Sequence, residues 1–235
     1  MNASIDWREF RMTFSDRKDA GRQLAAALAG YKGRNPVVLA LPRGGVPVAA
    51  EVAEALGAPL DLVLVRKIGL PWQPELAVGA VVDGTDPVIV RNEDVILSSG
   101  LSDATFKSVC DAELAEIARR KTRYIGLRAR AALAGKVVIV IDDGIATGAT
   151  MKAALRAIRQ HGPRELVLAV PVAPADTLSE LAPEVDALVC LVTPEPFGAI
   201  GYFYRDFSQV DDDTVVSILA RFPTGEPEAG ARMES

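Results

Sequence analysis

The stretch VVIVIDDGIATGAT, residues 137–150, decides the fold. Its first five residues are continuously apolar, which is typical of a strand buried on both faces of a parallel sheet. Two acids and a short turn follow, and we expect a helix to begin near Gly148. The stretch therefore predicts the carboxyl end of a parallel strand, which is where open α/β sheets bind their ligands.

Four further apolar runs have the same character, and helical patterns separate most of them. Repeated strand–helix–strand units form right-handed crossovers and an open sheet. We therefore predict an α/β fold with an open, mainly parallel five-stranded sheet and helices on both faces. The other predicted strands are Val37–Leu41, Leu60–Val65, Leu166–Val170 and Ala187–Val192, and the predicted helices between strands are Gly45–Gly57, Gly148–His161 and Pro174–Ala182.

Residues 66–136 interrupt this rhythm, because they are too many for a single crossover. Within them, Ala77–Val82 and Pro87–Arg91 flank a short turn and predict a hairpin, and a helix is expected from Ser102 to about Tyr124. Insertions of this size are usually lids or binding elements. Another helix is expected at Asp16–Leu28.

The predicted organisation is one domain over residues 1–222. Its core covers about 36–193, a lid and helix insertion covers 68–134, and a small hood at 194–222 is completed by the N-terminal segment. Residues 223–235 are polar and rich in Gly, Pro and Glu, so we expect a disordered tail there.

Composition excludes several classes of function. The net charge of −5 argues against a dedicated nucleic-acid binder, and the basic stretch Arg119–Arg130 is read more simply as a solvated helix end. The single histidine, His161, makes a Ser-His-Asp triad or a zinc site with several histidines hard to build. Two cysteines without metal-like spacing, and no signal-peptide or membrane-length apolar run, predict a cytoplasmic protein without a membrane partner.

The turn after the acids is suited to a sugar phosphate. Unpaired N–H groups at a helix start attract a phosphate, Gly144 and Gly148 let the backbone approach it, and Thr147 and Thr150 can add hydroxyl donors. The acids at 142 and 143 would repel that phosphate. They suit two neighbouring ribose hydroxyls, for which carboxylates are acceptors.

This segment resembles the phosphoribosyl pyrophosphate signature of the type I phosphoribosyltransferases. The resemblance covers about residues 14–222 and is especially strong to bacterial predicted phosphoribosyltransferases of undefined acceptor, through residues 14–21, 66–81 and 197–207. It implies that Asp142 and Asp143 hold the ribose 2′- and 3′-hydroxyls. It also implies that the backbone of the loop holds the 5′-phosphate, through Gly144, Ile145, Ala146, Thr147, Gly148, Ala149 and Thr150.

Two other segments are candidates for the pyrophosphate end. Arg43, Gly44 and Gly45 follow the first strand and are similar to the family's pyrophosphate loop, which commonly contains a non-proline cis peptide. Arg66 and Lys67 close the second predicted strand. The resemblance implies Mg²⁺ as cofactor, bridging pyrophosphate and ribose oxygens, with the two acids as indirect metal partners through ribose hydroxyls or water.

The acceptor side is less defined. Phe197 begins a cluster of aromatic residues that either stacks on the acceptor or packs the hood or a dimer contact. Asp206 in the hood and Glu75 in the lid, near Trp72, are the candidate catalytic carboxylates. Ala146 stands where hypoxanthine–guanine enzymes usually have an aspartate.

The resemblance implies transfer of phosphoribose from phosphoribosyl pyrophosphate to a small nitrogen acceptor, a nucleobase or related heterocycle, with release of pyrophosphate. A homodimer is one option for the assembly. The alternative is a non-catalytic regulatory protein that senses phosphoribosyl pyrophosphate or a nucleotide. Arg43, Lys67 and the lid favour the enzyme, and only the basic stretch Arg119–Arg130 favours a nucleic-acid regulator.

Overall fold

A parallel five-stranded sheet lies at the centre of the structure, a computed structural model that describes residues 13–83, 87–126 and 128–222. The strand order is β2-β1-β6-β7-β8, and every neighbouring pair is parallel. This confirms the predicted fold class. The strands are β1 (Pro36–Ala40), β2 (Leu60–Leu62), β6 (Val137–Ile141), β7 (Glu165–Val172) and β8 (Ala187–Val192).

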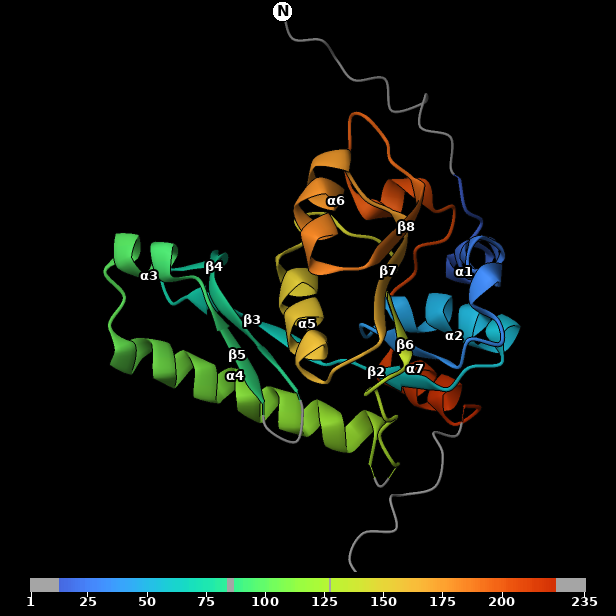
Figure 1. Cartoon of the computed structure of the whole chain (residues 1–235). Coiled ribbons are helices and arrows are strands. Elements are labelled where there is room, and N and C mark those ends of the chain that lie inside the picture. The colour runs from blue at the N-terminus through green and yellow to red at the C-terminus, as the bar shows by residue number, and fades with distance from the viewer. Residues whose placement is uncertain (1–12, 84–86, 127, 223–235) are drawn as a thin grey trace, which may run out of the picture.

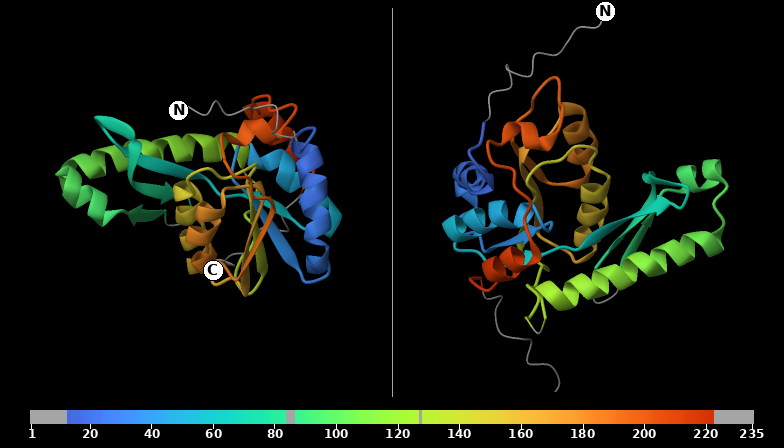
Figure 2. Two further views of the ribbon diagram at one scale, coloured as in Figure 1. Left: turned by 90° about the horizontal axis from the view of Figure 1, so that it is seen from above. Right: turned by 180° about the vertical axis from the view of Figure 1, so that it is seen from behind.

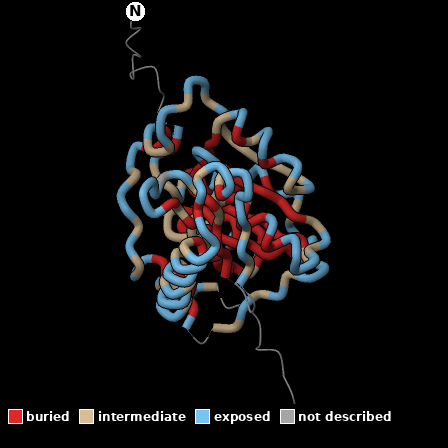
Figure 3. Tube along the Cα trace, turned by 90° about the vertical axis from the view of Figure 1, so that its left-hand side faces the viewer, coloured by how far each residue is buried: buried red, intermediate tan, exposed pale blue. Residues whose placement is uncertain are grey.

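Helices cover both faces of this sheet (Figure 1). One face carries α1 (Arg17–Ala27), α2 (Gly45–Leu56) and α7 (Asp212–Leu219), and the other carries α5 (Ala149–Gln160) and α6 (Ala175–Leu181). Alternate strand residues pack on opposite sides, for example Val38 with α2 and Val37 with α5. Both faces of β1 and β6 are therefore buried, which explains their uninterrupted apolar runs (Figure 3).

The long insertion forms an arm, residues 65–124, that projects from the side of the sheet that carries α5 (Figures 1 and 2). The arm contains the antiparallel strands β3 (Val65–Leu70), β4 (Gln73–Val82) and β5 (Val88–Arg91), followed by α3 (Glu93–Ser99) and α4 (Asp103–Tyr124). It has its own apolar core, which includes Ile68, Val78 and Phe106. Strands β3 and β4 also contact α5.

The second predicted strand was wrong in its extent. The run Leu60–Val65 divides, because β2 ends at Leu62 and the next residues leave the central sheet. Val63 still donates its N–H to the Ala40 carbonyl of β1 (3.0 Å), whereas Leu64 donates its N–H to the Asp83 carboxylate (2.8 Å). Residues 66 and 67 consequently lie inside β3 of the arm rather than at the end of a central strand.

The sequence predicted the hairpin and the long helix of the arm, but not all of their bounds and not every short helix. The helix expected from Ser102 begins at Asp103 with Ser102 as its N-cap, and the hairpin strand expected from Ala77 begins earlier, at Gln73. The short helices α3 and α7 were not predicted. No helix among the described segments is long and apolar enough to cross a membrane. The predicted tail at 223–235 and the hairpin residues 84–86 lie outside the described residues.

The basic stretch was read as a solvated helix end, which is wrong for its last two arginines. Arg130 pairs with Asp61 (Nε to Oδ2, 3.0 Å) and with Asp83 (Nη1 to Oδ2, 2.6 Å), and both carboxylates are buried. Arg128 donates to the backbone carbonyls of Leu60 and Phe222. These contacts fasten the segment that follows the arm to β2. The arginines at 119 and 120 pair with Glu116, and the arginine at 123 pairs with Asp213.

Replacing Arg130 with alanine should lower the free energy of unfolding by about 3–5 kcal/mol, because it removes the cation of the buried Asp83 and leaves Asp61 only the longer contact to Arg128 (3.8 Å). Urea denaturation measures this change. Arg119→Ala is the matched control, since it removes an exposed pair with Glu116 that is worth about 1 kcal/mol or less. Equal losses in the two variants would contradict the role assigned to Arg130.

Candidate functional site

Two loops meet at the carboxyl edge of β1 and β6. A Cβ added to Gly44 would lie 2.1 Å from the Asp143 Oδ2 atom, and one added to Gly45 would lie 2.9 Å from the Asp142 Cα atom. Only glycine allows this approach. The peptide between Pro42 and Arg43 is cis. The structure therefore places the predicted pyrophosphate loop directly against the two acids.

The turn between β6 and α5 combines a left-handed glycine with a helix start that no side chain caps. Gly148 has φ of +72°, and a Cβ there would lie 2.9 Å from the Thr177 methyl group. No side chain caps α5, so the N–H groups of its first turn are available to an anion. Thr147 is exposed and Thr150 is half-buried, whereas the side chain of Ile145 is buried and anchors the turn.

Hydrogen bonds from neighbouring strands and helices fix this turn. Ile145 donates its N–H to the Val172 carbonyl (3.0 Å), and the Thr177 hydroxyl donates to the Ala146 carbonyl (2.8 Å). Helix α6 thus supports the turn from behind through Thr177. Threonine at the start of a short helix gives no sequence signal for such a role, and sequence analysis did not identify it.

The two acids share a crowded environment. Asp143 donates its N–H to the Asp142 carboxylate (2.8 Å), and its own carboxylate accepts from the Arg17 Nε atom (2.7 Å). Desolvation and then the Asp143 carboxylate raise the pKa of Asp142. The Tyr204 hydroxyl donates to the Asp143 carbonyl (2.5 Å). The acid pair is therefore held by groups from the N-terminal helix and the hood.

Most rings of the hood pack on one another. Phe203 and Tyr204 are buried, Phe197 stacks on Phe203 with centroids 5.8 Å apart, and Tyr204 contacts Phe207 at 5.0 Å. Phe197 itself is only half-buried, and Tyr202 is 47% exposed. Packing of the hood is therefore the role that the structure gives to the three rings at 203, 204 and 207.

Asp206 lies in a tight turn of the hood. Its carboxylate accepts from the Ser208 hydroxyl and from the Ser208 N–H (2.9 Å), and these bonds, in that order, lower its pKa. Glu75 lies in β4, and Trp72 at the turn before it is 62% exposed. The two candidate catalytic residues therefore come from different parts of the molecule, the hood and the arm.

The three predicted cations have different surroundings. The Arg43 guanidinium is 3.5 Å from the Asp212 carboxylate, which also accepts from the Tyr124 hydroxyl (2.6 Å). Desolvation and this bond raise the pKa of Tyr124 to about 12. Arg66 pairs with Glu113 of α4 (2.6 Å). Arg66 is thus directed to the arm helix, away from α5.

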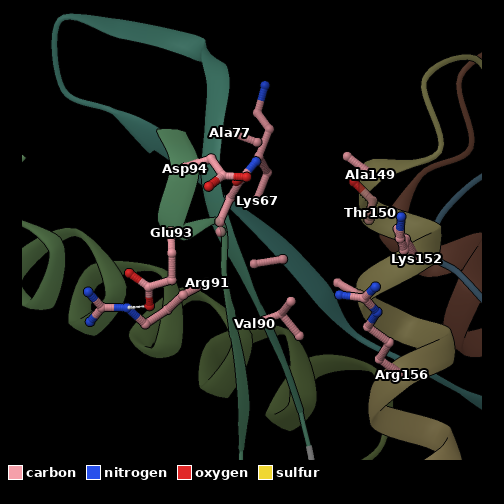
Figure 4. A pocket seen from close by; sticks show the side chains of 14 residues that line it. Lys67, Ala77, Val90, Arg91, Glu93, Asp94, Ala149, Thr150, Lys152 and Arg156 are labelled. Carbon is pink, nitrogen blue, oxygen red and sulfur yellow. Dashed lines mark hydrogen bonds and ion pairs between the residues drawn. The ribbon is translucent and has the colours of Figure 1, made fainter. Parts of the chain in front are cut away.

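Lys67 lines a cavity of about 440 Å³ between the arm and α5. Lys67 projects from the arm side, while Thr150, Lys152 and Arg156 lie opposite on α5 (Figure 4). Small residues of β4 and the first turns of α5 form part of the wall. The cavity therefore reaches the first two residues of α5, Ala149 and Thr150, and Lys67 faces the start of that helix across it.

The described residues contain no group of three or more His, Cys, Asp or Glu side chains arranged to bind a metal. The acid pair at 142 and 143 lies at the meeting point of the two loops. Two carboxylates suit Mg²⁺ that takes most of its oxygens from substrate and water.

Comparisons with known proteins agree with this geometry. Residues 15–193 match the phosphoribosyl transferase domain family. Proteins of two Mycobacterium tuberculosis strains, CDC 1551 and H37Rv, whose names describe them provisionally as phosphoribosyl transferases, are each 50% identical over 218 residues. The match covers 93% of this chain and 49% of theirs, so the chain spans about half the length of these curated relatives.

A solved structure is similar over almost its whole length. TT1426 from Thermus thermophilus is 42% identical, with a TM-score of 0.78, over 89% of this chain and 99% of that chain. The fold and the site define a type I phosphoribosyltransferase-like protein. The chain belongs to the phosphoribosyl transferase domain family.

Replacing Asp142 with asparagine should stabilise the ligand-free protein. The pKa of Asp142 is higher in the folded protein than in the unfolded chain. The folded state therefore loses stability as the pH rises from the pKa of the unfolded chain through that of the folded protein. Above both pKa values the charged carboxylate opposes folding. Asparagine removes that charge and can still accept the Asp143 N–H. At pH 8 we expect a Tm increase on the order of 2–4 °C, the shift that about 1 kcal/mol produces in a chain of this size.

Differential scanning calorimetry between pH 4 and pH 8 measures this effect. The Tm difference should shrink toward pH 4, where Asp142 in the unsubstituted protein takes up its proton. A lower Tm for Asp142→Asn at pH 8, or a difference that does not change with pH, would contradict the electrostatic cause.

Proposed function

We propose that this chain transfers the 5-phosphoribosyl group of phosphoribosyl pyrophosphate to a nitrogen acceptor of the nucleobase type and releases pyrophosphate. The observation that carries the proposal is the contact between Gly44 and Asp143. It sets an uncapped helix start, two acids and a second loop side by side at one edge of the sheet. A ligand with a phosphate, two vicinal hydroxyls and a second anionic group matches these three features in order.

Each part of the ligand has a proposed partner. The 5′-phosphate binds the first-turn N–H groups of α5 and the hydroxyls of Thr147 and Thr150. The ribose hydroxyls donate to the acid pair. The pyrophosphate binds the Arg43 side chain and the loop backbone, in which the Gly45 N–H already donates to the Leu41 carbonyl (3.1 Å). The Gly45 N–H is therefore occupied within the loop, and the role of Gly45 is to leave room for the Asp142 backbone.

The proposed reaction breaks the bond between ribose C1 and a pyrophosphate oxygen and forms a bond from C1 to the acceptor nitrogen. Positive charge develops on the ribose and negative charge on the leaving group, so the cations Arg43 and Lys67 assist departure. Mg²⁺, held indirectly by Asp142 and Asp143 through water or ribose hydroxyls, would further offset that negative charge. Glu75 and Asp206 remain the proposed groups for the acceptor proton.

The conversion of phosphoribosyl pyrophosphate with Mg²⁺ and a panel of acceptors, followed by pyrophosphate release, tests this function. The panel contains hypoxanthine, guanine, xanthine, adenine, uracil and orotate. Ala146 cannot accept a proton near purine N7, assistance that is typically worth about 10²–10⁴ in rate, so hypoxanthine and guanine should be poor acceptors. Binding of phosphoribosyl pyrophosphate without turnover on any nitrogen heterocycle would contradict the transferase and favour a sensing protein.

Arg43→Ala and Lys67→Ala should each weaken phosphoribosyl pyrophosphate about 10- to 100-fold, while ribose 5-phosphate changes little. Each variant removes one charge-assisted contact to the pyrophosphate, worth about 1.5–3 kcal/mol. Isothermal titration calorimetry with both ligands measures the difference. Arg119→Ala is the control, because that arginine pairs with Glu116 on the arm. Equal losses of affinity for both ligands would contradict the assignment of Arg43 and Lys67 to the pyrophosphate.

A further inference from the structure

We propose that Arg17 is a positioning residue that holds Asp143 in the orientation needed to receive a ribose hydroxyl. The inference deepens the proposed function and rests on it. Arg17 lies 126 positions before Asp143 in the chain, yet its Nε atom donates to the Asp143 Oδ2 atom at 2.7 Å. Both side chains are almost buried, with exposed fractions of 12% and 11%.

Three contacts fix the guanidinium of Arg17. Besides the bond to Asp143, its Nη1 atom donates to the Ser208 carbonyl (2.7 Å), and its Cζ atom lies 3.9 Å from the centre of the Phe207 ring. Arginine presents several donors in one plane, so it can bind a carboxylate and a carbonyl while a ring covers its face. The three contacts leave the side chain a single orientation.

The hood supplies two of these contacts and is itself tied to the segment before α1. Arg205 and Asp206 donate their N–H groups to the carbonyls of Phe14 (2.9 Å) and Ser15 (3.0 Å). The Asp206 carboxylate accepts from Ser208, which orders the turn whose carbonyl receives Arg17. Arg17 therefore joins the hood and the N-terminal helix to the acid pair through one side chain.

The position of the Asp143 carboxylate is restricted on two sides. Arg17 holds its Oδ2 atom, and a Cβ on Gly44 would lie only 2.1 Å from that same atom. The bond from Arg17 goes to Oδ2, so Oδ1 is the oxygen that we assign to the ribose hydroxyl. Without the cation, the neighbouring Asp142 carboxylate would repel Asp143, and the oriented acceptor would be lost.

Helix α1 does not need Arg17 for its own attachment. Ala20 and Leu24 are fully buried against the core, and Asp16 caps the helix by accepting from the Asp19 N–H (2.7 Å). Gly21 packs closely on α2, since a Cβ there would lie 2.6 Å from the Val48 carbonyl. The loss of Arg17 should therefore affect the acid pair more than the fold.

The test compares two ligands in four proteins. Ribose 5-phosphate uses the acid pair and the phosphate turn, whereas inorganic pyrophosphate does not use the acid pair. Calorimetric titrations with both ligands are made on the full chain, on Arg17→Gln and Arg17→Lys, and on Arg22→Gln. Arg22 is the control on the same helix, because its largely exposed side chain contacts only Asp19 (3.4 Å) among the ion pairs of the described residues.

We expect Arg17→Gln to lose about tenfold or more in affinity for ribose 5-phosphate and to keep its affinity for pyrophosphate. Arg17→Lys should recover part of the loss, because it retains the charge but not the fork of donors. Arg22→Gln should match the unsubstituted protein. If Arg17→Gln does not fold, Arg17→Lys replaces it in the test. We then expect a smaller loss of affinity for ribose 5-phosphate and an unchanged affinity for pyrophosphate.

Three results would overturn the inference. Unchanged affinity for ribose 5-phosphate in the Arg17 variants would show that Asp143 needs no positioning. Equal losses for both ligands would indicate a general structural role, and the proposed function would stand in either case. If the unsubstituted protein bound neither ligand, the proposed function would fail and the role of Arg17 would fail with it.

Discussion

The close contact between Gly44 and Asp143 is the constraint on which the rest of the site depends. It joins the loops after β1 and β6, which are neighbouring strands of the central sheet. Parallel pairing sets the two strand ends side by side, and the absence of a side chain at position 44 lets the loops touch. An uncapped helix start, a pair of acids and a cis-containing loop consequently lie together at one edge of the sheet.

This arrangement opposes the stability of the free protein. Two adjacent carboxylates are partly removed from water, and burial and mutual repulsion raise the pKa of Asp142. Arg17 offsets the charge of one of them, and the hood and α1 hold that arginine in place. Sites that bind ligands commonly retain such unfavourable groups, because their electrostatic cost is recovered when a hydroxyl or cation arrives.

Local patterns were enough to predict the central sheet and the turn between β6 and α5. Continuous apolar runs indicated β1, β6 and β7, and the acids and glycines after β6 indicated the turn itself. Contacts between distant segments could not be predicted. Nothing in the sequence near Arg17 points to Asp143. The arginines at 128 and 130 have the pattern of a solvated helix end in the sequence, whereas in the structure they lie beside the buried Asp61, and Arg130 also pairs with Asp83.

The division of the run Leu60–Val65 shows the same limit, since the bond from Leu64 to Asp83 depends on where β4 ends. Because the run divides, Arg66 and Lys67 both lie in β3 of the arm, where Arg66 pairs with Glu113 and Lys67 faces α5 across the cavity. The central claim is that the acid pair binds the ribose of phosphoribosyl pyrophosphate. Calorimetric titration of the full chain and of the double variant Asp142→Asn, Asp143→Asn with phosphoribosyl pyrophosphate and Mg²⁺ tests it most directly. The account predicts binding by the unsubstituted chain and a loss of about 100-fold or more in a double variant that stays folded, since two charge-assisted bonds are removed; equal affinity in the two proteins would contradict it.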